Sequence, residues 1–172
     1  MSNIQSMLAI GSLFLLSMTS MNFNSALLHS NTAELENKVY LTAFSLADDL
    51  IEEIKQKAYD ENTLVFPTVN RSTLTPAGSF GCNKVGGVFI SIDGETYPFF
   101  DDIDDYNNYS RDADAPHAEK YHISAEVYYV SETNPDSKSY TQTFHKRVDV
   151  TVSSPYLYLN KTVKLTFIFT HK

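Results

Sequence analysis

The first thirty-three positions of this chain contain no aspartate, glutamate, lysine or arginine, and this constrains the fold more than any other feature. The first charged residue is Glu34, and the first proline is Pro67. Because no proline interrupts this stretch and no charge requires water, the sequence predicts one long helix from about Asn3 to Tyr59. At a rise of about 1.5 Å per residue it would be roughly 85 Å long, whereas globular helices average about 11 residues.

The uncharged start has three interpretations: a signal peptide, a permanent membrane span or an assembly helix. The absence of lysine and arginine from Met1 to Ser6 argues against a secretory signal, which begins with a basic region. The densest apolar run, Met7–Met18, is shorter than the ~20 residues of a lone anchor and contains Gly11 and two serines. Small and hydroxyl residues suit close helix–helix packing. We therefore expect a segment that rests in a membrane and then joins a bundle of its own copies.

The contacts in such a bundle should come mainly from the apolar side chains of the segment. The predicted contact residues are Ile4, Gln5, Met7, Leu8, Ile10, Leu13, Phe14, Leu16, Met18, Met21, Phe23, Leu27 and Leu28.

The second half of the helix is amphipathic. Apolar residues recur there at steps of three and four, which places them on one face of a helix. This stripe predicts docking onto a sheet through Leu35, Val39, Ala43, Leu46, Leu50 and Ile54.

After the helix the pattern changes to short segments with the alternation of half-buried strands. Candidate strands are Thr63–Val69, Val85–Ile92, Tyr121–Tyr129, Phe144–Val152 and Val163–Phe169, and Asp93-Gly94 predicts a turn back into 95–99. A helix followed by hairpin-linked strands indicates an α+β fold with an antiparallel sheet. The predicted parts are 1–30, the apolar half of the helix; 31–62, its amphipathic half; and 63–172, a β domain with an acidic loop at 100–119.

Charge is unevenly distributed along the chain. The formal net charge is −8, which argues against nucleic acid as a partner. The acidic loop offers the oxygen ligands that calcium takes, and the candidates are Asp101, Asp102, Asp104 and Asp105. The alternative is a solvated loop that contacts the basic strand at Lys146 and Arg147 of a neighbouring copy.

The sequence gives little support for catalysis. The single cysteine, Cys82, cannot form an internal disulfide, and the cysteine and histidines lack the spacing of a zinc site. No nucleophile–base pair or phosphate-binding loop is recognisable. We therefore expect a non-enzymatic protein without an organic cofactor.

Two stretches support a resemblance to a known family. The acidic segment Phe-Asp-Asp-Ile-Asp-Asp-Tyr-Asn at 100–107 and the strand Lys-Arg-Val-Asp-Val-Thr-Val-Ser-Ser-Pro at 146–155 are similar to segments of pilin-like proteins related to the minor subunits of the mannose-sensitive haemagglutinin pilus. Together with the long apolar helix, they make the chain resemble type IV pilins and the pseudopilins of type II secretion. The resemblance implies a long helix packed on an antiparallel sheet.

The chain departs from this family in two respects. Pilins are made with a short basic leader that a prepilin peptidase removes. This sequence shows no such leader, so it resembles an already processed subunit beginning at Met1. Family members usually carry glutamate at the fifth position, where it is thought to pair with the N-terminal amine of a neighbour, and this chain has Gln5. Gln5 can still form a hydrogen bond but brings no charge, which weakens the ionic mechanism of register.

The resemblance implies a function in assembly. We expect a major subunit of an extracellular filament that resides in the inner membrane before assembly and has itself and the pilus assembly machinery as partners. Two alternatives remain: a minor pilin or pseudopilin that initiates or caps a filament, and a monomeric membrane-anchored binding module.

Overall fold

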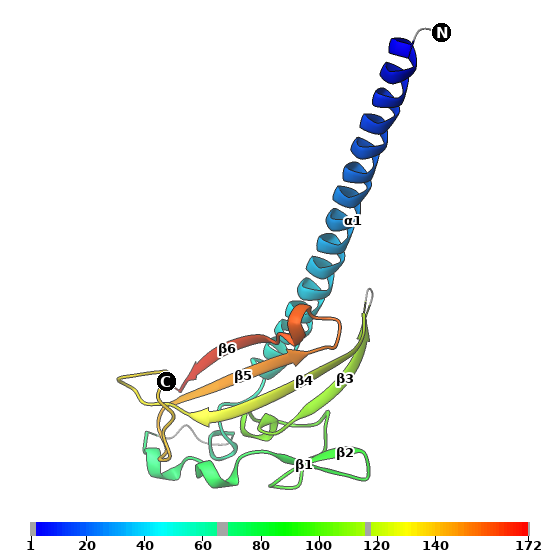
Figure 1. Ribbon diagram of the computed structural model, residues 1–172. Coiled ribbons are helices and arrows are strands. Elements are labelled where there is room, and N and C mark those ends of the chain that lie inside the picture. Colours follow the sequence, from blue (N-terminus) through cyan, green and yellow to red (C-terminus); the bar gives the residue numbers. More distant parts are fainter. Residues whose placement is uncertain (1–2, 65–68, 116–117, 172) are drawn as a thin grey trace. The chain divides into compact units, whose positions relative to one another are not determined.

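The computed structural model in Figure 1 describes residues 3–64, 69–115 and 118–171. Within them the fold is α+β, as predicted, with one long helix and an antiparallel sheet. The elements are α1 (Asn3–Ile54), β1 (Cys82–Val85), β2 (Val88–Ser91), β3 (Ser110–Ala115), β4 (Ala118–Tyr129), β5 (His145–Ser153) and β6 (Val163–Thr170), with short 3-10 helices η1 (Glu61–Thr63), η2 (Arg71–Thr73), η3 (Ala77–Ser79), η4 (Asp104–Tyr106) and η5 (Tyr158–Asn160).

The chain divides into two compact units between Lys38 and Val39. The first unit contains the larger part of α1, in which the side chains through Ala33 are exposed. The second unit contains the remainder of α1, from Val39 to Ile54, and all the strands.

Helix α1 ends five residues earlier than the predicted limit at Tyr59. After Ile54 the backbone turns and pairs with the acidic segment: the Ala58 amide donates to Asp101 O (2.9 Å), and the Ile103 amide donates to Ala58 O (3.0 Å). These bonds form a parallel bridge between Ala58 and Asp102. The helix therefore stops where its backbone finds partners distant in sequence.

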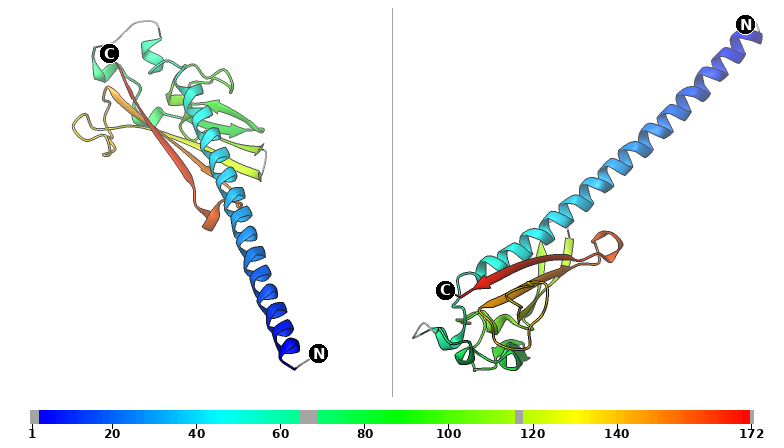
Figure 2. Two further views of the ribbon diagram at one scale, coloured as in Figure 1. Left: turned by 90° about the horizontal axis from the view of Figure 1, so that it is seen from above. Right: turned by 90° about the vertical axis from the view of Figure 1, so that its left-hand side faces the viewer.

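The Val39–Ile54 part of α1 packs against one face of the sheet, as Figures 1 and 2 show. Its buried side chains are Val39, Ala43, Ala47, Leu50, Ile51 and Ile54, with Leu46 partly buried. The docking stripe does not begin at Leu35, as the spacing predicted, because Leu35 is 55% exposed and belongs to the first unit. Docking thus starts one helical turn later, at Val39.

The main sheet has the order β3-β4-β5-β6, with every neighbouring pair antiparallel. Val148 lies opposite Val127 on β4 and Phe167 on β6. The predicted alternation is confirmed on β4, where Tyr121, Ile123 and every second residue through Tyr129 are buried. The predicted strands 144–152 and 163–169 correspond to β5 and β6.

The predicted single strand Val85–Ile92 is wrong. It is divided by Gly86-Gly87, which forms the turn of the β1–β2 hairpin, with Val85 opposite Val88. Both glycines have positive φ, +61° and +92°, which is the requirement of a tight two-residue hairpin turn. The sequence Asp93-Gly94 does turn the chain, and Ile90 then bridges to Thr96.

Two further predictions concern irregular segments. Residues 65–68 of the predicted strand Thr63–Val69 lie outside the described residues, while Thr63 belongs to the 3-10 helix η1. The segment 100–119 is not a solvated loop: it contains η4, all of β3 and the first residues of β4, and Asp102, Asp104 and Asp105 are buried. Aromatic rings within this segment pack together, with Phe100 edge-on against Tyr106 and Tyr109.

Candidate self-association surface and charged sites

The uncharged part of α1 exposes all of its large apolar side chains. Exposure ranges from 47% at Leu27 to 75% at Met7. The predicted contact residues Ile4, Met7, Leu8, Ile10, Leu13, Phe14, Leu16, Met18, Met21, Phe23, Leu27 and Leu28 all fall in this range, and Leu15 belongs with them. A helix that is apolar all round is characteristic of a protein core or a membrane span, not of a surface facing water.

Three hydroxyl side chains of this segment, those of Ser12, Thr19 and Thr32, donate hydrogen bonds to backbone carbonyls of the same helix. Ser12 Oγ donates to Ala9 O at 2.9 Å, and Thr19 Oγ1 donates to Leu16 O at 2.9 Å. Thr32 Oγ1 donates to Leu28 O, also at 2.9 Å. Donors paired in this way carry little cost in apolar surroundings. By its length and composition, the segment is long and apolar enough to cross a membrane.

A second site lies inside the second unit, around the fully buried side chain of Lys146. Its Nζ lies 2.8 Å from Asp60 Oδ2 and 2.6 Å from Asp104 Oδ1. It also donates to Tyr59 O at 2.7 Å and lies 4.4 Å from the centre of the Tyr59 ring. The expected contact between the acidic segment and a neighbour's Lys146 is therefore corrected, because the Lys146 of the same chain makes it.

The two carboxylates beside Lys146 respond differently to their environment. Burial opposes ionisation of Asp60, but Lys146 and the amides of Thr75 and Asn62 outweigh it and lower the pKa. Burial dominates at Asp104 and raises its pKa well above the usual value despite Lys146. Asp60 thus carries the negative charge that balances the lysine.

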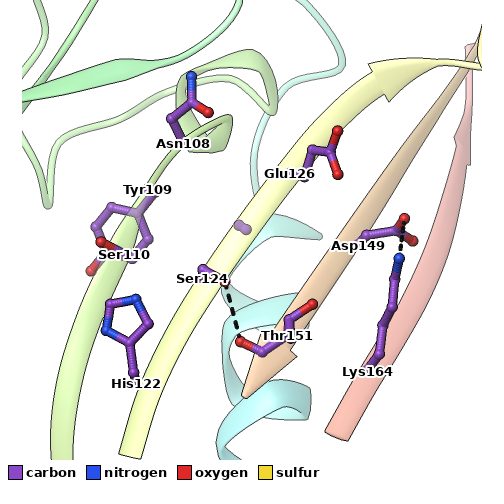
Figure 3. Close-up of a pocket in the computed structure, with 10 residues that line it drawn as sticks. Asn108, Tyr109, Ser110, His122, Ser124, Glu126, Asp149, Thr151 and Lys164 are labelled. Atoms are coloured by element: carbon purple, nitrogen blue, oxygen red, sulfur yellow. Dashed lines mark hydrogen bonds and ion pairs between the residues drawn. The ribbon is translucent and has the colours of Figure 1, made fainter. Parts of the chain in front are cut away.

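A third charged group lies on the outer face of the sheet, at a groove of about 430 Å³. Figure 3 shows the residues that line this groove. Buried Asp149 contacts Arg147 and Lys164, each at 2.9 Å, and accepts hydrogen bonds from Thr166 and Tyr128. Burial opposes ionisation, but these donors prevail and lower the pKa of Asp149 to about 2. The charge and the hydrogen-bond acceptors of the Asp149 carboxylate therefore find their partners within the same chain.

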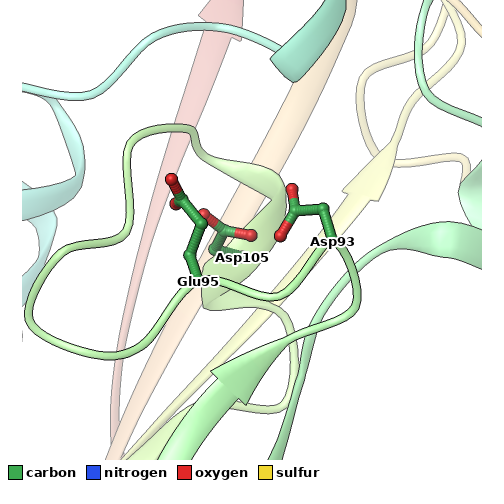
Figure 4. A group of neighbouring side chains, drawn as sticks. All are labelled: Asp93, Glu95 and Asp105. Carbon is green, nitrogen blue, oxygen red and sulfur yellow. The ribbon is translucent and has the colours of Figure 1, made fainter.

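The fourth group is a cluster of carboxylates, Asp93, Glu95 and Asp105, shown in Figure 4. One ligand oxygen from each lies within 4.8 Å of the others. Asp93 and Glu95 follow β2, while Asp105 belongs to η4. An oxygen-only donor set of this kind suits a hard cation such as calcium.

Of the four predicted calcium ligands, the structure brings only Asp105 into this cluster. Asp102 Oδ1 accepts the amides of Asp104 and Asp105, and Asp104 faces Lys146. The Asp101 amide donates to Glu95 Oε2 at 2.9 Å, so Asp101 helps to place a cluster residue. Burial raises the pKa of Asp102 to about 6.

Sequence reasoning missed the pairing of Asp60 with Lys146, although one signal was present. Lys146 is separated from Val148, Val150 and Val152 by even numbers of residues along the strand, so their side chains lie on the same face of the sheet, and these valines are buried. A lysine at an inward position of an otherwise apolar strand face indicates a buried partner.

Comparisons with known proteins leave the family open. Neither the protein-family models, nor the curated proteins, nor the solved structures gave a significant match. The arrangement of a long apolar helix and an antiparallel sheet is compatible with a pilin-like fold.

Proposed function

We propose that this protein is a structural subunit of an extracellular filament of the type IV pilus kind. The observation that carries the proposal is the uncharged part of α1, whose large apolar side chains are exposed in the single chain. Water is a poor environment for this surface, since burial of apolar area contributes about 25 cal/mol per Å². The surface therefore requires a partner, and a bundle of identical helices supplies one.

The same segment explains where the subunit resides before assembly. Its length and composition suit the inner membrane, because a segment without charged side chains avoids the cost of placing charge in lipid. Small and hydroxyl residues allow close approach of neighbouring helices. When identical chains associate head to tail without closing a ring, an open helical polymer results.

One residue favours a second candidate function, that of a minor pilin or pseudopilin that starts or caps the filament. Gln5 lacks the charge that glutamate provides in the family's register mechanism. The abundance of the protein in sheared surface material separates the two candidates, since a major subunit is plentiful there and a minor one is scarce.

The test replaces Leu13 with aspartate and compares purified full-length proteins by electron microscopy after detergent removal. The wild type should form filaments, whereas Leu13→Asp should form none, because each bundle contact would bury an unpaired carboxylate. The near-ultraviolet circular dichroism of the eleven tyrosines checks that the second unit remains folded.

The matched control is Tyr140→Asp, which introduces the same charge at an exposed position of the second unit. This variant should assemble like the wild type. Filaments from Leu13→Asp in wild-type yield, or a wild type that stays a single bilayer-embedded protomer, would contradict the proposal. The latter result would favour a monomeric membrane-anchored binding module.

A further inference from the structure

The carboxylate cluster of the second unit is held in place by its surroundings. Ser91 fixes the turn that carries Asp93 and Glu95. Its backbone amide donates to Glu95 O at 2.8 Å, and its side-chain Oγ accepts the Glu95 amide at 2.8 Å. The Ser91 hydroxyl in turn donates to Asp93 Oδ1. The Asp101 amide binds Glu95 Oε2 at 2.9 Å. The two chain segments that supply the carboxylates are thus joined by hydrogen bonds before any ligand is considered.

One member of the cluster is a buried carboxylate with an oxygen that has no hydrogen-bond donor among the described residues. Asp105 is 2% exposed, and its Oδ2 accepts no hydrogen bond from any residue that the structure describes. Asp60 and Asp149, which are as deeply buried, each contact a lysine. An ionised carboxylate buried without a partner is costly, so Asp105 must either bind a proton or face a cation.

The charges around Asp105 increase this cost. One carboxylate oxygen from each of Asp93 and Glu95 lies within 4.8 Å of an oxygen of Asp105, and Asp102, whose Oδ1 accepts the Asp105 amide, adds a further carboxylate. None of the ion pairs recorded for Lys146 and Arg111 includes Asp105: Lys146 contacts Asp60 and Asp104, and Arg111 contacts Glu53 at 3.6 Å.

The donor set identifies the class of cation. All three groups in the cluster are carboxylates, which excludes the nitrogen and sulfur ligands that zinc prefers. Calcium takes oxygen ligands at about 2.3–2.6 Å, so ligand oxygens up to about 5 Å apart fit around one ion. Magnesium requires shorter bonds and near-ideal octahedral geometry, which spans less.

We propose that Asp93, Glu95 and Asp105 bind one calcium ion, which fastens the turn after β2 to η4. Water or backbone oxygens complete the coordination sphere, as is usual for calcium. Bound calcium supplies the positive charge that buried Asp105 lacks. The inference concerns the second unit alone and does not depend on filament assembly.

The experiment titrates calcium chloride into the full-length protein, purified with a chelator and kept in detergent so that assembly plays no part. Isothermal titration calorimetry should give about one site with a Kd near 10⁻⁴ M, in the range of extracellular calcium modules. The unfolding temperature should rise with calcium concentration, and magnesium at the same concentrations should have a smaller effect.

Asp105→Asn retains the shape of the side chain and removes its charge. We expect at least about a tenfold loss of calcium affinity and a protein that unfolds no earlier than the wild type without calcium, because the buried charge is gone. Asp93→Asn changes an exposed member of the cluster and tests the site independently of folding. The matched control is Asp112→Asn, in which the same change is made at a carboxylate that is 79% exposed and outside the cluster.

The proposal stands if the Asp112 variant binds calcium like the wild type and the two cluster variants do not. Absence of calcium binding by the wild type at millimolar concentration would overturn it. Equal binding by the wild type and the Asp93 and Asp105 variants would place the ion elsewhere and would also overturn it.

Discussion

The two parts of this molecule depart from the usual distribution of residues in opposite directions. Through Ala33, α1 carries no charge and exposes large apolar side chains. The second unit buries an ordinary apolar core but also encloses charged side chains, among them Lys146, Asp60 and Asp149. In both parts the unusual residues need partners. In the second unit the chain provides most of them itself, whereas the partners of the first must come from outside.

This difference separates two kinds of substitution. A change in the second unit should alter the stability of the single chain, because its contacts are internal. A change in the uncharged part of α1 should alter association and leave the single chain as stable as before. Each of the following predictions measures one side of this comparison.

The largest effect on stability is expected from Lys146→Met, which keeps much of the volume and removes the charge. Asp60 would then be buried without its cation, and loss of one partner of a buried pair costs about 3–5 kcal/mol. Denaturant unfolding of the full-length protein in detergent, followed through the tyrosine signal, measures the loss. The double variant Lys146→Met, Asp60→Asn should recover part of the lost free energy, since the unpaired charge of Asp60 is gone. If Lys146→Met alone were as stable as the wild type, the Lys146–Asp60 pair would be dispensable for stability.

A pair of leucine-sized truncations compares the two parts directly. Ile54→Ala removes a fully buried side chain from the helix–sheet contact and should cost about 2–5 kcal/mol of unfolding free energy. Leu13→Ala removes an exposed side chain and should change that free energy by less than about 0.5 kcal/mol. Its effect should appear in sedimentation as weaker self-association. A comparable loss of stability from both variants would mean that the comparison is false.

The pH dependence of stability should depend on Asp149. Its folded pKa, about 2, lies below the unfolded value of about 3.9, so its contribution is present above about pH 4 and is lost as the pH falls toward 2. A shift of nearly two units corresponds to about 2–3 kcal/mol. Asp149→Asn should therefore cost about 2–3 kcal/mol at neutral pH, and the difference from the wild type should shrink between pH 4 and pH 2.

Other carboxyl groups do not interfere with this test. Asp102 and Asp105 have raised pKa values, about 6 and about 8, so they disfavour folding as the pH rises through those values. Their contributions are common to the wild type and the Asp149 variant and cancel in the difference. The control is Asp136→Asn, because Asp136 also contacts Arg147 but is 90% exposed. A constant difference between pH 7 and pH 2 would exclude the assigned role of Asp149.

Sequence periodicity predicted the parts of this fold that depend on neighbours along the chain. The charge-free start, the helical stripe and the alternation in β4 are local patterns, and they located α1 and the main sheet. The burial of Asp102, Asp104 and Asp105 was not predictable in this way, since the four aspartates of 101–105 indicate a solvated loop. Among them Asp104 is buried against Lys146, which lies far along the chain. The carboxylate cluster likewise joins η4 to the turn after β2, so it contains only Asp105 of the four expected ligands.

Among the ion-pair variants, the smallest effect on the free energy of unfolding is expected from a second lysine, Lys138. Comparison with Lys146 shows how much burial adds to the contribution of an ion pair. Lys138 contacts Glu126 at 3.0 Å, close to the distance between Lys146 and Asp60, but both side chains are about half exposed. Water and salt screen such a pair, so Lys138→Ala should cost less than about 1 kcal/mol, and added salt should reduce even this. The same denaturant unfolding, at low and high ionic strength, gives both values. If the loss matched that of Lys146→Met, the Coulomb contact alone and not its enclosure would account for the role of Lys146 in the second unit.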